Sequence, residues 1–275
     1  NSNVTALDMS SDGQKIFFVE QDKISDDSIV YIDDLNSMRP TPLFKKSNIT
    51  EIAISHDLKY LAYIMRRSSG AEETIIYDLD SSIHRITNLS ACDMLTWGKN
   101  SRNLVCASYP HMELKILDVQ SGEKTSYSLG VEALALVDIQ SSPNRPDIIF
   151  SVVENDETGT IYRVLLEEGG EVEELHSLTV PTAEMALSRD GTTLFFLRRR
   201  ANAIDIVAKD LESSSGQIES LVPAFVVGES SSQINPKFIH AFDVVDSERN
   251  LHIYATKVAE KNQLVLAKVN FDGEA

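Results

Sequence analysis

The sequence has only two cysteines and one tryptophan among its 275 residues, and it has no long uninterrupted apolar run. Two cysteines are too few for the disulfide framework that stabilises small secreted proteins. A membrane-spanning helix needs about 18 uncharged apolar residues in succession, and no stretch approaches that length. The hydrophobic share of 42% is nevertheless enough for a substantial buried core, which argues against a disordered chain.

Basic residues are also scarce in this chain. It carries 25 lysines and arginines against 42 aspartates and glutamates, so its formal net charge is −17. Such a chain repels a polyanion at every distance that salt does not screen. We therefore expect no direct binding of nucleic acid by this part of the protein.

The two cysteines belong to no CxxC motif and no Cys/His cluster, so the sequence predicts no metal site and no cofactor. If one hairpin joins Cys92 to Cys106, its turn lies near Asn100 and Ser101. The residue that faces Cys106 is then close to Leu95 rather than Cys92. This register predicts two free thiols.

One short pattern recurs along the chain. An apolar residue is followed by two small or polar residues, an Asp or Asn, three further residues, and then Ile or Leu with two mainly apolar neighbours. The apolar triplets begin at residues 16, 61, 104, 148, 194 and 251, so five copies are 43 to 46 residues apart and the last follows after 57. The clear copies begin with Met9–Asp12, Ile54–Asp57, Trp97–Asn100 and Leu187–Asp190, and the weaker ones with Ser141–Asn144 and Val244–Ser247.

Each copy predicts a β-hairpin. The Asp or Asn side chain can accept a hydrogen bond from the backbone two residues further on, and Gly13 or Gly191 supplies a positive φ. The flanking residues are β-branched or aromatic, and no segment keeps a 3.6-residue apolar period over three turns. We expect strands nearly throughout and almost no helix.

A third strand follows in each repeat, and then a turn and a short polar fourth strand such as His84–Ile86. Four strands in about 44 residues make one blade of a propeller, in which radial repetition leaves only short sheet edges. The sequence therefore predicts an all-β fold, a six-bladed β-propeller of four-stranded antiparallel blades, as a single domain over residues 1–275. The predicted blades span approximately residues 5–44, 51–89, 93–129, 133–178, 183–222 and 239–275, with an insertion at 223–237.

The sixth predicted blade is one strand short, because few residues follow its third strand. We expect Asn1–Val4 to pair with strand 263–269 as the missing strand, so that pairing of the N- and C-terminal segments closes the propeller. The chain begins at Asn1 without an initiator methionine or a leader, and we expect it to be part of a longer protein.

Several of these residues resemble a known family. The repeats of TolB-type six-bladed propellers, also called WD40-like TolB repeats, are similar to Ser10–Gly13, Ser188–Gly191, Arg67–Gly70 and Tyr77–Asp80. The resemblance covers nearly the whole chain. It implies the fold rather than the function, because the repeat itself is structural.

Proteins with such repeats include periplasmic TolB, the propeller domains of prolyl-oligopeptidase-like peptidases, and the extracytoplasmic parts of membrane-anchored regulators of the ToxR and CadC type. The resemblance implies a periplasmic or extracytoplasmic location. Our leading hypothesis is a non-catalytic propeller that binds a ligand, peptide or protein as the sensory domain of a membrane-anchored transcriptional regulator, with the membrane tether outside this sequence. One alternative is a TolB-like envelope protein-interaction module.

An enzyme is the remaining alternative, either a propeller lactonase or cyclase or the propeller of a prolyl-oligopeptidase-like peptidase. A peptidase domain requires a Gly-x-Ser-x-Gly nucleophile elbow, which the sequence lacks. A lactonase or cyclase requires metal-binding His, Asp and Glu around its channel, and the six histidines are scattered without ligand spacing. We therefore predict that this chain is not an enzyme.

In a propeller, the loops between second and third strands share one face with the connections between blades. Ten of the 25 basic residues fall in these loops, which favours a site for a small acidic signal or an acidic peptide. Acidic residues such as Asp26 and Glu72 lie in the same loops, so a solvated surface whose charges cancel is the alternative. Guanidinium groups bind carboxylates bidentately, which favours Arg67 and Arg198–Arg200. The candidate binding residues are Arg66, Arg67, His111, Arg198, Arg199, Arg200 and Lys257.

Two further groups of residues have structural explanations. Acidic pairs such as Asp33–Asp34 and Glu173–Glu174 are explained by turns more simply than by a calcium site or an acid–base pair. Seven aromatic residues fall at predicted inter-blade positions, and we expect them in the core: Phe18, Tyr31, Tyr63, Tyr77, Phe150, Tyr162 and Phe196.

Overall fold

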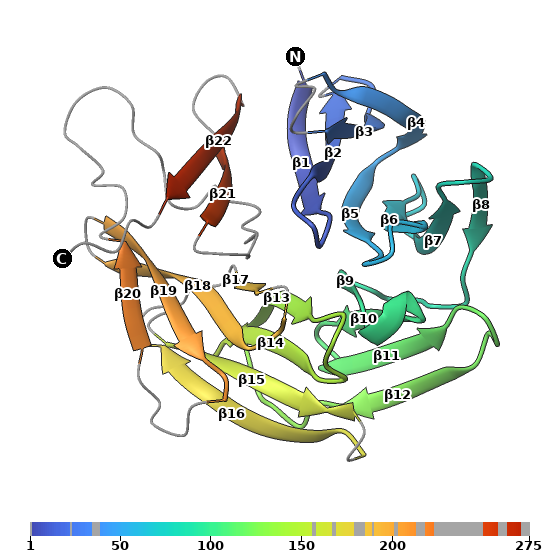
Figure 1. Ribbon diagram of the computed structural model, residues 1–275. Coiled ribbons are helices and arrows are strands. Elements are labelled where there is room, and N and C mark those ends of the chain that lie inside the picture. The colour runs from blue at the N-terminus through green and yellow to red at the C-terminus, as the bar shows by residue number, and fades with distance from the viewer. Residues whose placement is uncertain are drawn as a thin grey trace. The chain divides into compact units, whose positions relative to one another are not determined.

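The structure is a computed structural model that consists almost entirely of β-strands (Figure 1). In the part of the chain that it describes, helix is confined to one 3-10 turn at Lys99–Ser101 and the 3-10 residue Leu166, which confirms the expectation of almost no helix. None of the described helical segments is long and apolar enough to cross a membrane. The described residues are 2–22, 24–34, 39–155, 158–166, 169–178, 185–188, 190–200, 203–212, 218–222, 250–257 and 263–270.

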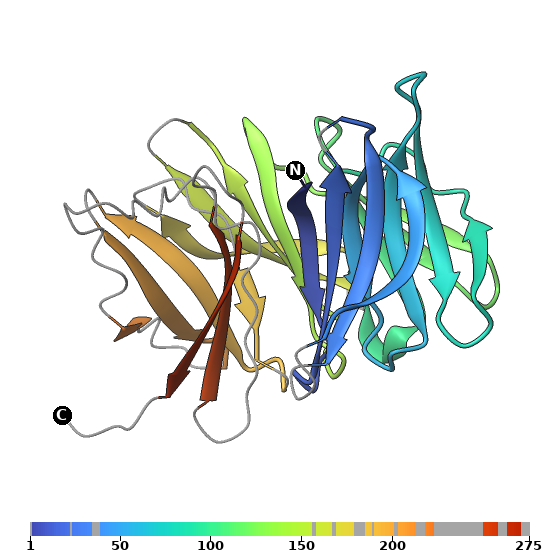
Figure 2. The same cartoon turned by 90° about the horizontal axis from the view of Figure 1, so that it is seen from above.

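The chain divides into two compact units, and the first, Asn1–Leu129, contains three four-stranded antiparallel blades. Figure 2 shows the strands of blade 1 side by side, with β1 and β4 at the two edges. Blade 1 consists of β1 (Ser2–Met9), β2 (Lys15–Asp22), β3 (Asp27–Asp34) and β4 (Thr41–Ser47). Blade 2 consists of β5 (Ile49–Ile54), β6 (Tyr60–Arg66), β7 (Glu72–Asp78) and β8 (Ile83–Ile86). Blade 3 consists of β9 (Met94–Trp97), β10 (Asn103–Ser108), β11 (Glu113–Asp118) and β12 (Lys124–Ser128).

The second unit, Gly130–Ala275, contains two more blades of the same kind and a two-stranded sheet. Blade 4 consists of β13 (Ala135–Ser141), β14 (Ile148–Val153), β15 (Gly159–Leu165) and β16 (Glu171–Leu178). Blade 5 consists of β17 (Met185–Leu187), β18 (Thr193–Arg200), β19 (Ala203–Asp210) and β20 (Ile218–Val222). The two-stranded sheet consists of β21 (Asn250–Lys257) and β22 (Gln263–Asn270).

The structure thus describes five four-stranded blades, not the six that the repeats predict. In the range of the predicted sixth blade, 239–275, it describes β21 and β22, which pair along their full length. The other residues of that range and the predicted insertion 223–237 lie outside the described residues. Four-stranded antiparallel blades, the coarser part of the prediction, are confirmed.

The predicted pairing of Asn1–Val4 with strand 263–269 is wrong. Strand β1 already begins at Ser2, which pairs with Asp22 at the far end of β2. The hairpin continues to this point because β2 is eight residues long and a register shift at Thr5 keeps the two strands aligned. The N-terminal residues therefore lengthen the innermost strand of blade 1.

In blades 1, 2 and 5 the turn between the first and second strands is built by a serine and an aspartate. In blade 1 the Asp12 carboxylate accepts hydrogen bonds from the Ser10 hydroxyl at 2.6 Å and from the backbone N–H of Gln14 at 3.0 Å. In blade 5 Asp190 accepts from Ser188 at 2.6 Å and from the N–H of Thr192 at 3.0 Å. These bonds confirm the predicted acceptance two residues further on.

Apolar side chains fill the space between consecutive blades within each unit. One cluster joins blades 1 and 2 around Phe17, Leu61 and Tyr63, and another joins blades 2 and 3 around Trp97 and Cys106. A third cluster joins blades 4 and 5. Of the seven aromatic residues predicted to lie in the core, five are buried, and the half-buried Tyr31 and Tyr162 stack on Phe18 and Phe150 at 5.2 and 5.3 Å.

Polar contacts also join the innermost strands of consecutive blades. The Asp8 carboxylate on β1 accepts a 2.6 Å hydrogen bond from the N–H of Ile54 on β5, and Asp138 on β13 accepts one of 2.6 Å from Met185 on β17. Burial raises the pKa of Asp8 to about 7, and the hydrogen bonds from the N–H groups of Ile54 and Met9 offset only part of this rise. An innermost strand is a sheet edge, and these carboxylates satisfy N–H groups that the sheet leaves unpaired.

Candidate functional site

The candidate site is the loop surface of blades 2 and 3, which we define as residues 66–72, 87–93 and 109–112. These are the loop of the β6–β7 hairpin, the connection between the two blades, and the loop of the β10–β11 hairpin. The connection is fixed to blade 2 where Thr87 donates to the C=O of Thr74 through both its N–H and its hydroxyl, each at 2.9 Å. Two predicted site residues of blade 2 and one of blade 3 belong to this surface: Arg66, Arg67 and His111.

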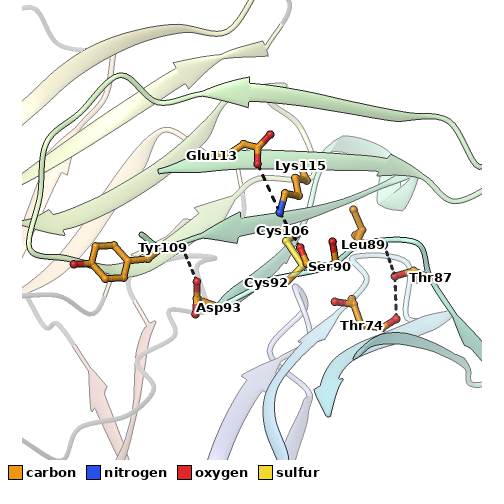
Figure 3. Close-up of a disulfide and its surroundings, with 10 residues drawn as sticks. All are labelled: Thr74, Thr87, Leu89, Ser90, Cys92, Asp93, Cys106, Tyr109, Glu113 and Lys115. Carbon is orange, nitrogen blue, oxygen red and sulfur yellow. Dashed lines mark hydrogen bonds and ion pairs between the residues drawn. A yellow bond between two sulfur atoms is a disulfide. The ribbon is translucent and has the colours of Figure 1, made fainter. Parts of the chain in front are cut away.

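The prediction of two free thiols is wrong, because Cys92 and Cys106 form a disulfide with a Cα–Cα distance of 5.5 Å (Figure 3). The predicted register itself is correct, since Cys106 pairs with Leu95. Cys92 precedes β9, in a segment that folds back over β10, where the N–H of Asp93 donates to the C=O of Ala107 at 2.9 Å. This turn brings together two sulfur atoms that a straight hairpin would keep apart.

The disulfide lies in the core between blades 2 and 3. Cys92 and Cys106 are 2% and 0% exposed, and they pack with Leu89, Trp97 and Leu104 among others. A buried disulfide of this kind is shielded from thiols in solution. It holds the connection between the blades against the second strand of blade 3.

Beside the disulfide, Asp93 fixes the loop that carries the predicted site residue His111. The Asp93 carboxylate accepts a 2.6 Å hydrogen bond from the N–H of Tyr109, as Figure 3 shows. At the other end of the loop Met112 is buried, and its C=O accepts from the N–H of Leu129 at 2.8 Å. Tyr109 and His111 are exposed between these two anchors.

A lysine adds a further link between blade 3 and the connection. The Lys115 ammonium donates to the C=O of Ser90 at 2.7 Å and lies 3.6 Å from the Glu113 carboxylate (Figure 3). Its side chain is only 12% exposed, so this contact is screened less than a contact at the surface. The connection 87–93 is thus held by backbone hydrogen bonds, by the hydrogen bond from Lys115 and by the disulfide.

The predicted anion-binding arginines of blade 2 are paired with glutamates across their own hairpin. Arg66 donates to Glu72 through Nε at 3.0 Å and Nη2 at 2.5 Å, and Nη2 of Arg67 lies 2.6 Å from Glu73. Both arginine side chains remain 53% exposed. An acidic ligand would have to compete with these carboxylates, so the two arginines are weaker candidates than the sequence suggests.

The other predicted site residues lie in the second unit. The backbone of Arg198–Arg200 forms the end of β18, where Arg198 pairs with Asp205 and Arg200 with Ala203, and Lys257 pairs with Gln263 at the end of β21. The structure does not describe the side chains of these residues. Whether they bind an anion therefore stays a prediction.

Two histidines that the sequence leaves without a role have structural partners. Nε2 of His56 donates to the C=O of Trp97 at 2.8 Å, and burial lowers the pKa of His56. Nδ1 of His84 is hydrogen-bonded to the Tyr63 hydroxyl at 3.0 Å. Among the described residues, no group of three or more His, Cys, Asp or Glu side chains is placed to hold a metal ion.

The loop surface of blades 2 and 3 is suited to macromolecular recognition. It presents the Tyr109 ring, the His111 imidazole and two glutamate-paired guanidinium groups on anchored backbone, and tyrosine and arginine are enriched among the residues that dominate binding energy in protein interfaces. Sequence reasoning found His111, Arg66 and Arg67 but missed Tyr109 and its anchor Asp93. The Tyr-Pro-His sequence after an apolar strand is the only sign of this turn in the sequence.

No protein-family model matches the sequence, and no curated protein matches it either. Solved structures do resemble it. TolB from Acinetobacter baumannii aligns with a TM-score of 0.63 at 14% identity, covering 79% of this chain and 56% of that chain. The propeller domain of the Trilobed protease from Pyrococcus furiosus, described as having an open velcro topology, aligns at 0.60 and 15% identity, covering 99% and 83%. The acylaminoacyl peptidase from Pyrococcus horikoshii aligns at 0.57 and 12% identity, covering 100% and 52%.

These similarities establish a TolB-like β-propeller fold. The chain spans little more than half of the TolB and acylaminoacyl peptidase chains that it matches. A fold shared at such low identity hosts many functions, so the function has to be argued from the site.

Proposed function

We propose that this chain is a non-catalytic propeller that binds a protein or peptide partner through the loop surface of blades 2 and 3, outside the cytoplasm. The finer form of the proposal is the sensory domain of a membrane-anchored transcriptional regulator. The observation that carries the binding function is the exposed turn of Tyr109 and His111 between the anchors Asp93 and Met112. A rigid exposed turn loses little conformational entropy when a partner binds.

The disulfide supports the location. Disulfides form and persist in oxidising compartments, and cytosolic reductants keep most thiols reduced. Cys92–Cys106 is buried and joins the connection between blades 2 and 3 to a strand of blade 3, which is typical of a structural bond rather than a catalytic one. The TolB-like fold supports the same location by analogy.

Site-specific photo-crosslinking tests the binding function. A photoreactive phenylalanine analogue at His111 should form a crosslink to one partner in cells that produce the full-length protein. Lys124 provides the matched control. It is exposed and lies in the same blade, at the end of β12 that is farther from the loop carrying His111. Equal crosslinking at the two positions, or none at His111, would refute this surface.

A thiol assay tests the location. In protein denatured directly from cells, Cys92 and Cys106 should not react with maleimide, and peptide mapping should find both residues labelled after reduction. Reaction without reduction would show that Cys92 and Cys106 are free in the cell and would remove the support for an oxidising compartment.

The second candidate is the propeller of a longer peptidase. The whole of this chain aligns with about half of the acylaminoacyl peptidase chain, which favours this alternative. The complete gene product separates the candidates. A winged-helix domain with one membrane span supports the regulator, a signal peptide with a small α/β domain supports a TolB-like envelope module, and a hydrolase domain supports the peptidase.

A further inference from the structure

The outermost strand of blade 2 differs from the outer strands of its neighbours in what it exposes. Strand β8 is the last strand of its sheet, with β7 on one side only (Figure 1). Its residues Ile83 and Ile86 are 62% and 60% exposed. Among the described residues only three other large apolar side chains are exposed, and none of these lies on a strand: Ile24, Tyr109 and Leu134.

The other outer strands whose side chains are described carry the usual protection of a sheet edge. Strand β4 contains Pro42, two lysines and a register shift against β3, and β16 contains three glutamates and a register shift against β15. Strand β12 exposes only polar side chains. Proline, charges and bulges are the devices that keep an edge from pairing with another chain, and β8 has neither a proline nor a bulge.

Backbone groups of β8 are available for pairing. The N–H of Thr87 donates to Thr74 on β7, so the alternation of an antiparallel pair directs the N–H and C=O of His84 and Ile86 away from β7. In the described chain no strand pairs with β8 on that side. An added strand would find two residues with free donors and acceptors there.

The edge is also held rigidly in place. The His84 ring is hydrogen-bonded to Tyr63 at 3.0 Å and packs against Phe44 and Tyr77 at centroid distances of 4.8 and 4.7 Å. Tyr63 and Tyr77 are buried, so β8 is fixed to the core through this ring. A strand edge that is already fixed loses little conformational entropy when another strand is added.

The charges around β8 indicate which kind of strand fits. Arg85 is exposed and is the only ionic side chain of the strand. Burial lowers the pKa of His84, and the nearby Lys46 ammonium of blade 1 lowers it further. The Asp78 carboxylate on β7 interacts electrostatically with Arg85, but it already accepts hydrogen bonds from two backbone N–H groups of the following turn. On a chain of net charge −17, this edge therefore presents a local cationic site between two isoleucines.

We propose that β8 is a docking edge for an extended acidic segment of a protein partner, which adds a fifth strand to blade 2. Main-chain hydrogen bonds to His84 and Ile86 supply affinity. Side chains alternate between the two faces of a strand, so Arg85 and Ile86 lie on opposite faces of β8. A strand that alternates acidic and aliphatic residues therefore places carboxylates beside Arg85 and aliphatic side chains beside Ile86, which supplies selectivity. This surface is separate from the loop surface of blades 2 and 3 and does not depend on the function proposed for it.

A capped six-residue peptide of alternating glutamate and valine serves as the probe, with a lysine–valine peptide of the same length as the control. In amide NMR spectra of the intact chain, the glutamate peptide should shift the signals of His84 and Ile86 and leave those of β12 in place. The double substitution Ile83→Glu and Ile86→Glu removes both apolar contacts and repels the acidic peptide, so it should weaken binding at least tenfold. The matched control Ile24→Glu, at an isoleucine exposed in a turn, should leave binding unchanged.

Three outcomes would overturn the proposal. Equal binding of the lysine–valine peptide would show that the charge of β8 selects nothing, and unchanged binding by the double variant would place the peptide elsewhere. Concentration-dependent dimerisation that the double variant abolishes would identify a second copy of this chain as the occupant. Because both isoleucines are exposed, the double variant should keep its thermal midpoint, which confirms that it folds.

Discussion

The Asp8 carboxylate and the backbone N–H of Ile54 form a 2.6 Å hydrogen bond between the innermost strands of blades 1 and 2. Asp138 and Met185 repeat this contact between blades 4 and 5, also at 2.6 Å. In both pairs the aspartate carboxylate also accepts a hydrogen bond from the N–H of the next residue in the chain, which is Met9 or Ile139. The innermost edges of consecutive blades are thus joined by aspartate side chains in both units.

The raised pKa of Asp8 predicts a pH dependence of stability. Its pKa is about 7 in the folded state against 3.8 for an ordinary Asp, so between these values the folded state binds the proton and the unfolded state releases it. The contribution of Asp8 to stability therefore falls as pH rises from about 4 to 7. Urea unfolding of Asp8→Asn and of the wild type should show the variant gaining relative stability across this range. A difference that stays constant with pH would contradict the prediction.

The lowered pKa of His56 predicts that stability changes with pH in the opposite direction. Burial lowers its pKa from 6.5, so below that pH the unfolded state takes up a proton that the folded state resists, and stability falls as pH falls. His56→Gln keeps an N–H donor for the C=O of Trp97 and removes the titration. Between about pH 7 and 5 the wild type should lose stability relative to the variant. The fluorescence of Trp97, the only tryptophan, reports unfolding at this contact, and parallel curves for the two proteins would refute the assignment.

A side chain at position 191 should clash with a residue of the neighbouring blade 4. A Cβ at this position would lie 2.4 Å from the Ser142 hydroxyl oxygen, and φ is +76°. Gly191→Ala should therefore cost about 2–4 kcal/mol of unfolding free energy, from overpacking together with backbone strain. Gly122→Ala is the matched control, because φ is +78° there and no atom lies within 4 Å of the added Cβ. Its cost should be about 1–2 kcal/mol, and equal losses in both variants would exclude the close contact.

The disulfide predicts a loss of stability on removal. It joins residues separated by 14 positions in the sequence, and the double substitution Cys92→Ala and Cys106→Ala should lower the unfolding free energy by about 3 kcal/mol. Urea unfolding under non-reducing conditions measures the difference. Wild-type protein unfolded in the presence of a reducing dithiol provides the control and should match the double variant. Identical midpoints for oxidised wild type and double variant would rule out the bond.

Much of the fold follows from local sequence. The Asp12 and Asp190 turns encode their hairpins within five residues, and the spacing of such turns along the chain predicts the blades. The turn near Asn100 and Ser101 predicts the register that pairs Cys106 with Leu95. Contacts between distant segments are harder to predict from the sequence. The course of the N-terminal strand depends on how far β2 extends. The disulfide depends on a connection that folds back after Leu89, and the repeat pattern of the sequence does not indicate this fold-back.

The candidate site shows the same division. The loop positions of Arg66, Arg67 and His111 follow from the repeat, because the repeat fixes where hairpins turn. The glutamate partners of the arginines and the exposure of Tyr109 depend on side-chain geometry. The edge of β8 is similar, since the sequence Ile-His-Arg-Ile predicts a short fourth strand but not that both isoleucines face solvent.

The bond between Cys92 and Cys106 also sets how blade 3 responds to mechanical force. A chain pulled from its two ends cannot extend through the 14 positions inside this covalent loop. In a single-molecule pulling experiment the oxidised protein should therefore release roughly 45 Å less contour length than the reduced protein. Force passes through the Cys92–Cys106 bond, so the segment of the first hairpin of blade 3 that lies between the two cysteines stays unextended while the bond is intact.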